Sequence, residues 1–251
     1  RVIVTGASSG IGESLSRELA RQGAHVGMIA RREQHLETIA KEIREKGGTV
    51  DFVAADVGER TAVYDAIRHL RDLMGGVDLL IANAGVGKPV KLSPFNVEDM
   101  ERLMRVNYLG VLYSIEAVLP EMLAQKSGHI CGISSMGAFT GVPGEQAYSA
   151  SKAALSNFLE GLRLQLRSEG VAVTTVHPGF VRTPMTQHFQ SLPFAWSSEK
   201  AARKIVKAIR RGKKVYNFPW QLRLLMSLSR WIPDWMVARL VNRYTSTKSE
   251  E

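Results

Sequence analysis

A tyrosine and a lysine one helical turn apart carry the strongest chemical signal in the sequence. Tyr148 and Lys152 are the first and last residues of the segment Tyr-Ser-Ala-Ser-Lys. Residues four positions apart on a helix lie on the same face, so this phenol and this ammonium group point the same way. A phenol has a pKa near ~10 and exchanges protons poorly at neutral pH, whereas a neighbouring positive charge favours the phenolate. We therefore expect Lys152 to lower the pKa of Tyr148, which would make the phenol a general acid and base.

A serine at the end of an apolar run supplies a second polar group. Ser135 precedes Tyr148 by thirteen residues and closes the run Ile-Cys-Gly-Ile-Ser-Ser, which is typical of a buried strand. The ends of neighbouring parallel strands form the crevice where ligands bind, so Ser135 can face Tyr148 across a substrate. Ser134 is the alternative, but strand alternation and the spacing favour Ser135 and leave Ser134 a structural role.

A glycine-rich turn follows the first strand-like run and opens the first helical pattern. Glycines allow the chain to reverse sharply and allow backbone amides to approach a pyrophosphate. The helix that follows directs its unpaired N–H groups toward the anion. An ordinary strand-to-helix turn is the alternative, but the strand–turn–helix context favours a dinucleotide. The residues of this turn that we expect to bind the cofactor are Thr5, Gly6, Ser8, Ser9, Gly10, Ile11 and Gly12.

Two arginines follow the second strand-like run, at Arg31 and Arg32. A site specific for NAD commonly places a carboxylate here, where it accepts the 2′-hydroxyl of the adenosine ribose. A 2′-phosphate would be repelled by a carboxylate but accepts charge-assisted hydrogen bonds from guanidinium groups. The alternative is that both arginines are the solvated start of a helix, where they would oppose the helix dipole. We favour NADP(H) over NAD(H).

The order and spacing of these features resemble the short-chain dehydrogenase/reductase family over about residues 1–215. The glycine turn has the spacing Gly-x-x-x-Gly-x-Gly after Thr5, and Ser135 and the Tyr-x-x-x-Lys pair follow it in the family's order. The resemblance implies hydride transfer between a nicotinamide and a carbonyl or secondary alcohol carbon. Tyr148 would exchange the proton, Ser135 would bind the reacting oxygen, and Lys152 would also bind the nicotinamide ribose. The family has a mobile lid over the substrate at about residues 184–196. The apolar residues of this segment either line an apolar substrate pocket or belong partly to the core.

The same resemblance assigns roles to further residues. It implies that Asn107 is catalytic and positions a water for proton relay to Lys152. Asp56 would hold the adenine amino group, a role compatible with a turn or cap residue, and Asn83 would tie strand ends together, although Ala82 replaces the family's preceding Asn. The other positions that it places around the cofactor are Val57, Ala84, Gly85, Pro178, Gly179, Val181 and Thr183.

Apolar runs and helical patterns alternate along the chain. Short β-branched runs at 1–5, 25–30, 49–54, 79–82, 129–133 and 171–177 suit parallel strands that are buried on both faces. Between them, apolar residues recur every three or four positions at 12–22, 33–46, 60–74, 97–123 and 148–169, and a further helix is expected from Ser197 or Ser198 to about Arg211. This alternation predicts an α/β protein with a doubly wound parallel sheet, the three-layer Rossmann fold. We expect one domain over 1–215 and a basic, apolar helical extension over 216–251, with a second short helix at 235–241.

The charge of the chain is unevenly distributed. The net charge is +9, and residues 199–251 carry all of it, with 13 Lys and Arg against 4 Asp and Glu. A neutral body with a basic tail is not a general polyanion-binding surface, so we expect no nucleic acid partner. The apolar extension must be covered by its own subunit, by a partner subunit or by a membrane surface, and we rank contact with protein before a membrane surface. The family's habit of pairing through the helices at 97–123 and 148–169 implies a homodimer or homotetramer.

The single cysteine, Cys131, cannot form a disulfide within the chain, and no His or Cys pair has metal-ligand spacing. We therefore expect no metal and a cytoplasmic protein, with membrane association as the alternative. The chain opens inside a strand-like run without methionine, which predicts an earlier natural start. Two other functions compete with the reductase. A non-enzymatic NADP(H) sensor would not need Tyr148, Lys152, Ser135 and Asn107 together, and an epimerase or dehydratase of this family would need a larger C-terminal domain.

Overall fold

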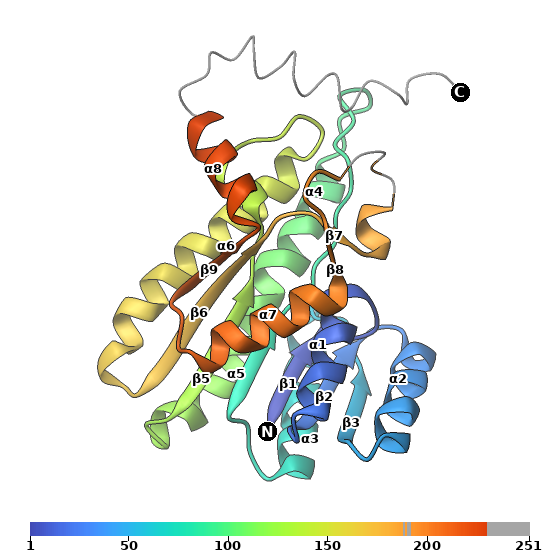
Figure 1. Ribbon diagram of the computed structural model, residues 1–251, viewed down its shortest axis with the longest axis vertical. Helices are drawn as coiled ribbons and strands as arrows, with labels where there is room; N and C mark the ends of the chain where they lie inside the picture. Colours follow the sequence, from blue (N-terminus) through green and yellow to red (C-terminus); the bar gives the residue numbers. More distant parts are fainter. Residues whose placement is uncertain (188, 190–191, 230–251) are drawn as a thin grey trace.

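The computed structural model describes residues 1–187, 189 and 192–229, and these form one parallel sheet with helices on both faces (Figure 1). The strand order is β3-β2-β1-β4-β5-β6-β9, and every neighbouring pair is parallel. The strands are β1 (Val2–Thr5), β2 (His25–Ala30), β3 (Thr49–Ala54), β4 (Leu79–Ala82), β5 (Gly128–Ile133), β6 (Val171–Pro178) and β9 (Val215–Phe218). The predicted doubly wound α/β fold is confirmed.

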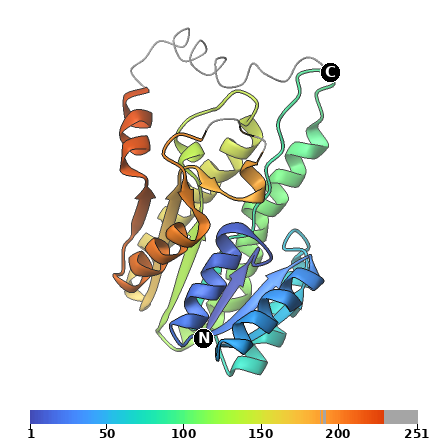
Figure 2. The same cartoon turned by 45° about the vertical axis from the view of Figure 1, so that its right-hand side comes forward.

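Two helical layers bury the two faces of the sheet, and each layer has its own apolar core. Figure 2 shows the layer made of α1 (Gly10–Arg21), α2 (Glu33–Glu45) and α7 (Ser198–Arg210) on one side. The opposite layer contains α3 (Arg60–Met74), α5 (Gly110–Ala124) and α6 (Gln146–Gln165). Their apolar residues recur with helical period, as in Leu15 and Leu19 of α1 or Leu155 and Leu159 of α6, and all four are buried.

The order of the strands in the sheet determines where the functional site lies. The chain moves outward from β1 to β2 and β3, then returns to the other side of β1 to start β4. At such a reversal the two neighbouring strands send their connections to opposite faces, which leaves a crevice beyond their carboxyl ends. The glycine turn that follows β1 and the Asn83 segment that follows β4 both lie at this crevice.

The structure differs from the sequence prediction at two places. The helix expected over 97–123 is α4 (Val97–Met104) and α5, joined by a π-helical turn at Arg105–Leu109. The seventh strand, β9, was not predicted, because the polar Asn217 interrupts its apolar residues and its pairing with β6 is a contact between distant segments. β9 spans the boundary expected between residues 215 and 216, and it pairs with β6 along Thr175–Pro178.

The chain after β9 continues into α8 (Trp220–Ser229), and a small two-stranded pair, β7 (Val181–Arg182) with β8 (Trp196–Ser197), precedes α7. The second helix expected at 235–241 lies outside the described residues. Within the described ranges, no helix combines the length and the apolarity that crossing a bilayer requires.

Candidate active site

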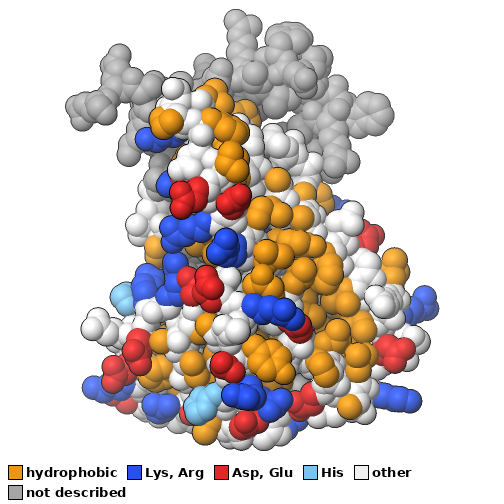
Figure 3. Space-filling view, turned by 180° about the vertical axis from the view of Figure 1, so that it is seen from behind, with side chains coloured by type: hydrophobic (Ala, Val, Ile, Leu, Met, Phe, Trp, Pro, Cys, Tyr) orange, Lys and Arg blue, Asp and Glu red, His pale blue; other side chains and the backbone are white. Residues whose placement is uncertain are grey.

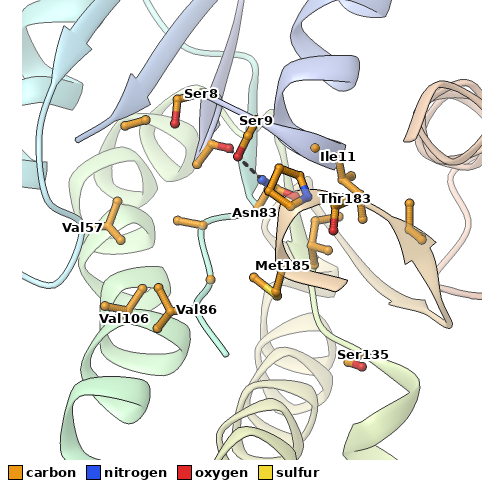
Figure 4. Close-up of a pocket in the computed structure, with 18 of the residues that line it drawn as sticks. Ser8, Ser9, Ile11, Val57, Asn83, Val86, Val106, Ser135, Thr183 and Met185 are labelled. Carbon is orange, nitrogen blue, oxygen red and sulfur yellow. Dashed lines mark hydrogen bonds between the residues drawn. The ribbon is translucent and has the colours of Figure 1, made fainter. Parts of the chain in front are cut away.

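A cleft of about 370 Å³ lies at the carboxyl ends of the strands and brings the two sequence signals together. In Figure 4, Ser8 and Ser9 of the glycine turn lie at one end of the cleft and Ser135 lies at the other. Of the residues expected to act in catalysis or to bind the cofactor, all line this cleft except Thr5, Gly12 and Asn107, which are buried behind it.

Glycine is required in the turn because the backbone there folds tightly on itself. Gly6 and Gly10 have φ values of 68° and 59°, in the left-handed region that favours glycine. A Cβ at Gly12 would lie 2.2 Å from the Gly6 carbonyl oxygen, far inside van der Waals contact. The start of α1 can therefore approach the turn closely only without a side chain, and the first N–H groups of this helix face the cleft end.

Asn83 and Thr5 tie the ends of β4 and β1 together behind the cleft. The Thr5 hydroxyl accepts hydrogen bonds from the backbone N–H groups of Asn83 and Ala84, both at 3.1 Å. The Asn83 amide donates to the backbone oxygens of Thr5 at 3.0 Å and Gly6 at 3.3 Å. These bonds hold the glycine turn against the Asn83 segment, which is the scaffold role expected for Asn83.

The two arginines lie at the glycine-turn end of the cleft. The Arg32 guanidinium donates to the Ser8 hydroxyl at 3.0 Å and to the Ser9 hydroxyl at 2.7 Å. Arg31 lies 3.5 Å from the carboxylate of Asp56, which also accepts from the N–H of Gly58 at 2.9 Å. Asp56 is thus both a turn residue and a wall of the cleft, and two exposed guanidinium groups converge on this end of the site.

The catalytic candidates meet at the opposite end. Tyr148 and Lys152 lie on one face of α6, with the Lys152 Nζ 5.9 Å from the centre of the Tyr148 ring. Lys152 is 3% exposed, and its ammonium donates to the backbone oxygen of Ile133 at 2.9 Å. Ser135 follows β5, and its hydroxyl is near enough to the Tyr148 phenol to affect the pKa of that group. The Ser135 hydroxyl also accepts from the Gly137 N–H at 3.0 Å, which fixes its orientation.

Burial controls the proton affinities at this end. Burial raises the pKa of the Tyr148 phenol, and the charge of Glu145 raises it further, while the Ser135 hydroxyl opposes the rise. The expected fall in the pKa of Tyr148 is therefore not seen. Burial also lowers the pKa of Lys152 to about 8, so its charge titrates near neutrality and is not a fixed ammonium. Sequence spacing places the two groups together but carries no information about their desolvation.

Ser134 belongs to a buried network behind the site. Its hydroxyl donates to the backbone oxygen of Lys152 at 3.0 Å and lies 2.7 Å from the Ser156 hydroxyl. Ser156 in turn lies 3.0 Å from the Nε2 of His177, which is 4% exposed at the end of β6. Burial lowers the pKa of His177 to about 4, so the imidazole is neutral at physiological pH. The network links the ends of β5 and β6 to the backbone of α6 at Lys152.

Asn107 lies in the π-helical turn between α4 and α5 and is fully buried. Its side-chain oxygen accepts from the Val86 N–H at 2.8 Å, and its amide donates to the Val86 oxygen at 2.9 Å and to the Ser151 hydroxyl at 3.0 Å. A π turn inserts one extra residue, which reorients the side chains that follow it and is frequent at functional sites. Asn107 thus connects the segment after β4 to the helix that carries Tyr148 and Lys152.

Sequence reasoning missed several residues of the cleft wall. Each of them lies next to, or within a few residues of, a motif that was recognised, and this closeness in sequence could have identified them. They are Ala30, Ala55, Val86, Val106, Ile133, Pro184 and Thr186. Of the aromatic and apolar residues in the expected lid, Met185 lines the cleft. Trp196 instead stacks on Phe218 with ring centres 4.7 Å apart, and it packs against the core. Among the described residues, no three His, Cys, Asp or Glu side chains gather closely enough to hold a metal.

Comparisons with known proteins identify the family and the fold of the chain. A family model described as short chain dehydrogenase matches residues 1–192. An uncharacterised oxidoreductase of Myxococcus xanthus (strain DK1622) is 40% identical over 92% of each chain. A crystal structure of an actinorhodin polyketide ketoreductase variant with NADPH is 29% identical, with a TM-score of 0.79 over 86% of this chain and 94% of that one. A short-chain dehydrogenase/reductase from Burkholderia phymatum in complex with NAD has a TM-score of 0.84, at 24% identity over 90% and 91% of the two chains, and shares the fold.

Proposed function

The chain belongs to the short-chain dehydrogenase/reductase family of NAD(P)-dependent oxidoreductases, and we propose that it is an NADP(H)-preferring oxidoreductase that reduces ketones or aldehydes, or oxidises secondary alcohols in the reverse direction. One observation carries the proposal: Tyr148, Lys152 and Ser135 converge at one end of a cleft whose other end is the glycine turn. A dinucleotide with its nicotinamide ring at the first end and its pyrophosphate at the second would place hydride transfer beside the Tyr148 phenol.

The residues of the cleft fit a dinucleotide. The backbone of the glycine turn, with two glycines at positive φ, forms a cradle that a Cβ would fill. The N-terminus of α1 would hold the pyrophosphate, and Asp56 with Val57 would flank the adenine. Arg31, Arg32 and the Ser9 hydroxyl would hold a 2′-phosphate, and this cluster of donors supports the NADP(H) preference. Lys152 would bind the nicotinamide ribose.

The bound nicotinamide would supply or accept a hydride at the carbonyl carbon. The protein's own residues would manage the oxygen and its proton. In the reductive direction the Tyr148 hydroxyl donates its proton to the carbonyl oxygen as charge develops there, and its raised pKa keeps it protonated for this step. The Ser135 hydroxyl donates a hydrogen bond to the same oxygen and stabilises that charge. Lys152, partly charged near pH 8, favours the phenolate that remains.

Asn107 and the apolar wall complete the proposed site. Asn107 forms hydrogen bonds with the backbone N–H and C=O of Val86 and with the Ser151 hydroxyl. These bonds fix the distance between the segment after β4 and helix α6. A water bound near it would carry protons to Lys152. Met185, Val86 and Val106 line the cleft, and their side chains favour an apolar substrate.

The test measures NADPH absorbance with a panel of ketones and aldehydes. We expect turnover, and we expect Tyr148→Phe to reduce kcat by about 10²- to 10⁴-fold because the general acid is lost. Tyr64→Phe is the matched control, since Tyr64 lies exposed on α3 away from the cleft. Tight NADPH binding without turnover on the whole panel would contradict the proposal and favour a cofactor sensor.

We also propose that the protein forms a homodimer or homotetramer through α5 and α6. Figure 3 shows hydrophobic side chains gathered on the side of the molecule that faces away from the viewer in Figure 1. Partly exposed apolar residues of α5 and α6, such as Tyr113, Leu119 and Phe158, support this assignment, as does Leu164, which is 69% exposed. Light scattering at several protein concentrations measures the state, and a monomer at micromolar concentration would contradict the proposal.

A further inference from the structure

The outer face of α7 concentrates positive charge on a chain whose body is neutral. Six exposed cations, Lys200, Arg203, Lys204, Lys207, Arg210 and Arg211, fall within an arc of about 120° on a helix of 3.6 residues per turn. The opposite face of α7 is buried in the core, where Ala202, Ile205 and Ile209 lie. The cations therefore form a stripe along the exposed side of α7, a helix that Figures 1 and 2 show at the surface of the molecule.

The centre of this basic stripe has no acidic counterpart. Among residues 1–187, 189 and 192–229, no carboxylate lies within 4 Å of Lys204, Lys207 or Arg211. The flanking residues do have protein contacts: Arg210 donates to Gln22 at 3.2 Å, and Lys200 lies over the Trp196 ring at 4.5 Å. The turn that follows, at 211–214, extends the stripe with two further exposed lysines. Arg203 lies near Glu18 and Glu199, and its charge helps to lower the pKa of both carboxyl groups. The uncompensated cations Lys204, Lys207 and Arg211 are suited to an anionic surface.

Exposed apolar side chains follow the basic stripe along the chain. After the turn, β9 leads into α8, where Trp220 is 69% exposed and Leu224 is 54% exposed. The sequence beyond α8 continues to mix tryptophans with arginines, including Trp231, Trp235 and Arg239. Tryptophan and arginine are both accommodated by the headgroup layer of a bilayer, where one part of the side chain is apolar and the other is wet. A nucleic acid backbone or an acidic protein would offer the cations a partner, but neither would account for the exposed Trp220 and Leu224.

We propose that the basic stripe of α7, with the turn at 211–214, docks the protein on the headgroup layer of a membrane that contains anionic phospholipid. Each lysine or arginine near such a surface adds a similar increment of attraction, and the attraction falls as salt screens it. None of these residues lines the catalytic cleft, so docking and hydride transfer can be tested separately.

The experiment is flotation of the full chain with vesicles of phosphatidylcholine containing about a third phosphatidylserine, compared with phosphatidylcholine alone. We expect binding to the anionic vesicles that weakens with salt. The variant Lys204→Gln, Lys207→Gln, Arg211→Gln, Lys214→Gln removes four charges from the basic stripe. We expect it to bind the anionic vesicles about 10²- to 10³-fold more weakly, because each of the four charges contributes about fivefold near such a surface.

A control variant removes the same number of exposed cations from other surfaces: Lys41→Gln, Arg102→Gln, Lys126→Gln, Arg167→Gln. We expect it to bind vesicles like the parent chain, and an NADPH-induced rise in Tm in both variants shows that they are folded. Equal loss in the two variants, no loss in the α7 variant, or equal recovery with neutral vesicles would overturn the proposal. Binding to duplex DNA as tight as that to anionic vesicles, and equally lost in the α7 variant, would also overturn it in favour of a nucleic acid surface.

Discussion

Removal of the two guanidinium groups at the glycine-turn end is expected to change which cofactor the protein binds. We consider Arg31→Ala with Arg32→Ala, since both side chains are exposed at the cleft and would face a 2′-phosphate. A phosphate carries about −1.5 to −2 charge near neutral pH. A unit charge pair 4 Å apart interacts by about 1 kcal/mol in bulk water and by about 4 kcal/mol at an effective dielectric constant of 20.

The exposure of these side chains selects the lower part of that range. The Arg31 side chain is 50% exposed, and it must loosen its contact with Asp56 at 3.5 Å, a surface pair worth about 0–1 kcal/mol. Each arginine is therefore expected to contribute about 1–1.5 kcal/mol to NADPH binding, and the pair about 2–3 kcal/mol. The double variant should bind NADPH about 30- to 150-fold more weakly. Its affinity for NADH should change by less than about threefold, because NADH has no 2′-phosphate.

Titration of nicotinamide fluorescence with NADPH and NADH measures both dissociation constants directly and needs no substrate. Lys41→Ala, which removes one charge from the exposed side of α2, controls for the overall loss of positive charge. The NADPH affinity of the parent chain should also weaken with ionic strength more steeply than that of the double variant. Equal losses for NADPH and NADH would refute the reasoning, because they would show that Arg32 only supports the Ser8 and Ser9 hydroxyls.

Three further predictions concern the catalytic lysine, the buried histidine and the glycine turn. Because burial lowers the pKa of Lys152 to about 8, kcat/KM for reduction should fall above that pH. Lys152→Arg should move this alkaline fall in the pH profile above pH 10, and a fall that does not move would belong to another group. His177 has a folded-state pKa of about 4, below its unfolded value near ~6.5, so the unfolded state binds more protons between these two pH values. The free energy of unfolding should therefore fall by up to about 3 kcal/mol as the pH drops from about 6.5 to about 4. Denaturant titrations should find this loss reduced in His177→Gln, and an unchanged pH slope would contradict the assignment. Gly12→Ala should lose at least about 2 kcal/mol of stability and most NADPH binding, because the new Cβ meets the Gly6 oxygen. The control Gly161→Ala, in α6 with open space around it, should be neutral or gain up to about 1 kcal/mol. Equal Tm values for the two variants would contradict the steric argument.

Local patterns in the sequence were sufficient to predict the layers of the fold. Six of the seven strands of the sheet were predicted as short, β-branched and mostly apolar runs, because a sheet between two helical layers buries side chains on both of its faces. β9 escaped prediction because its place in the sheet depends on pairing with β6, a contact between distant segments. The π turn at Asn107 was also not predicted, since the apolar pattern is that of one continuous helix and the side chain's bonds to Val86 are tertiary.

The sequence by itself determined which chemical groups the protein has and how they are spaced along its elements. The Tyr148–Lys152 pair on one helical face, the glycine turn and the arginines after the second strand all follow from short-range geometry. Only the tertiary structure decided their protonation and their partners, because desolvation and hydrogen bonding depend on atoms brought from elsewhere in the chain. The pKa of Tyr148 rises and that of Lys152 falls as the sheet and α6 bury them, and Arg32 reaches Ser8 and Ser9 only when β1 and β2 lie side by side.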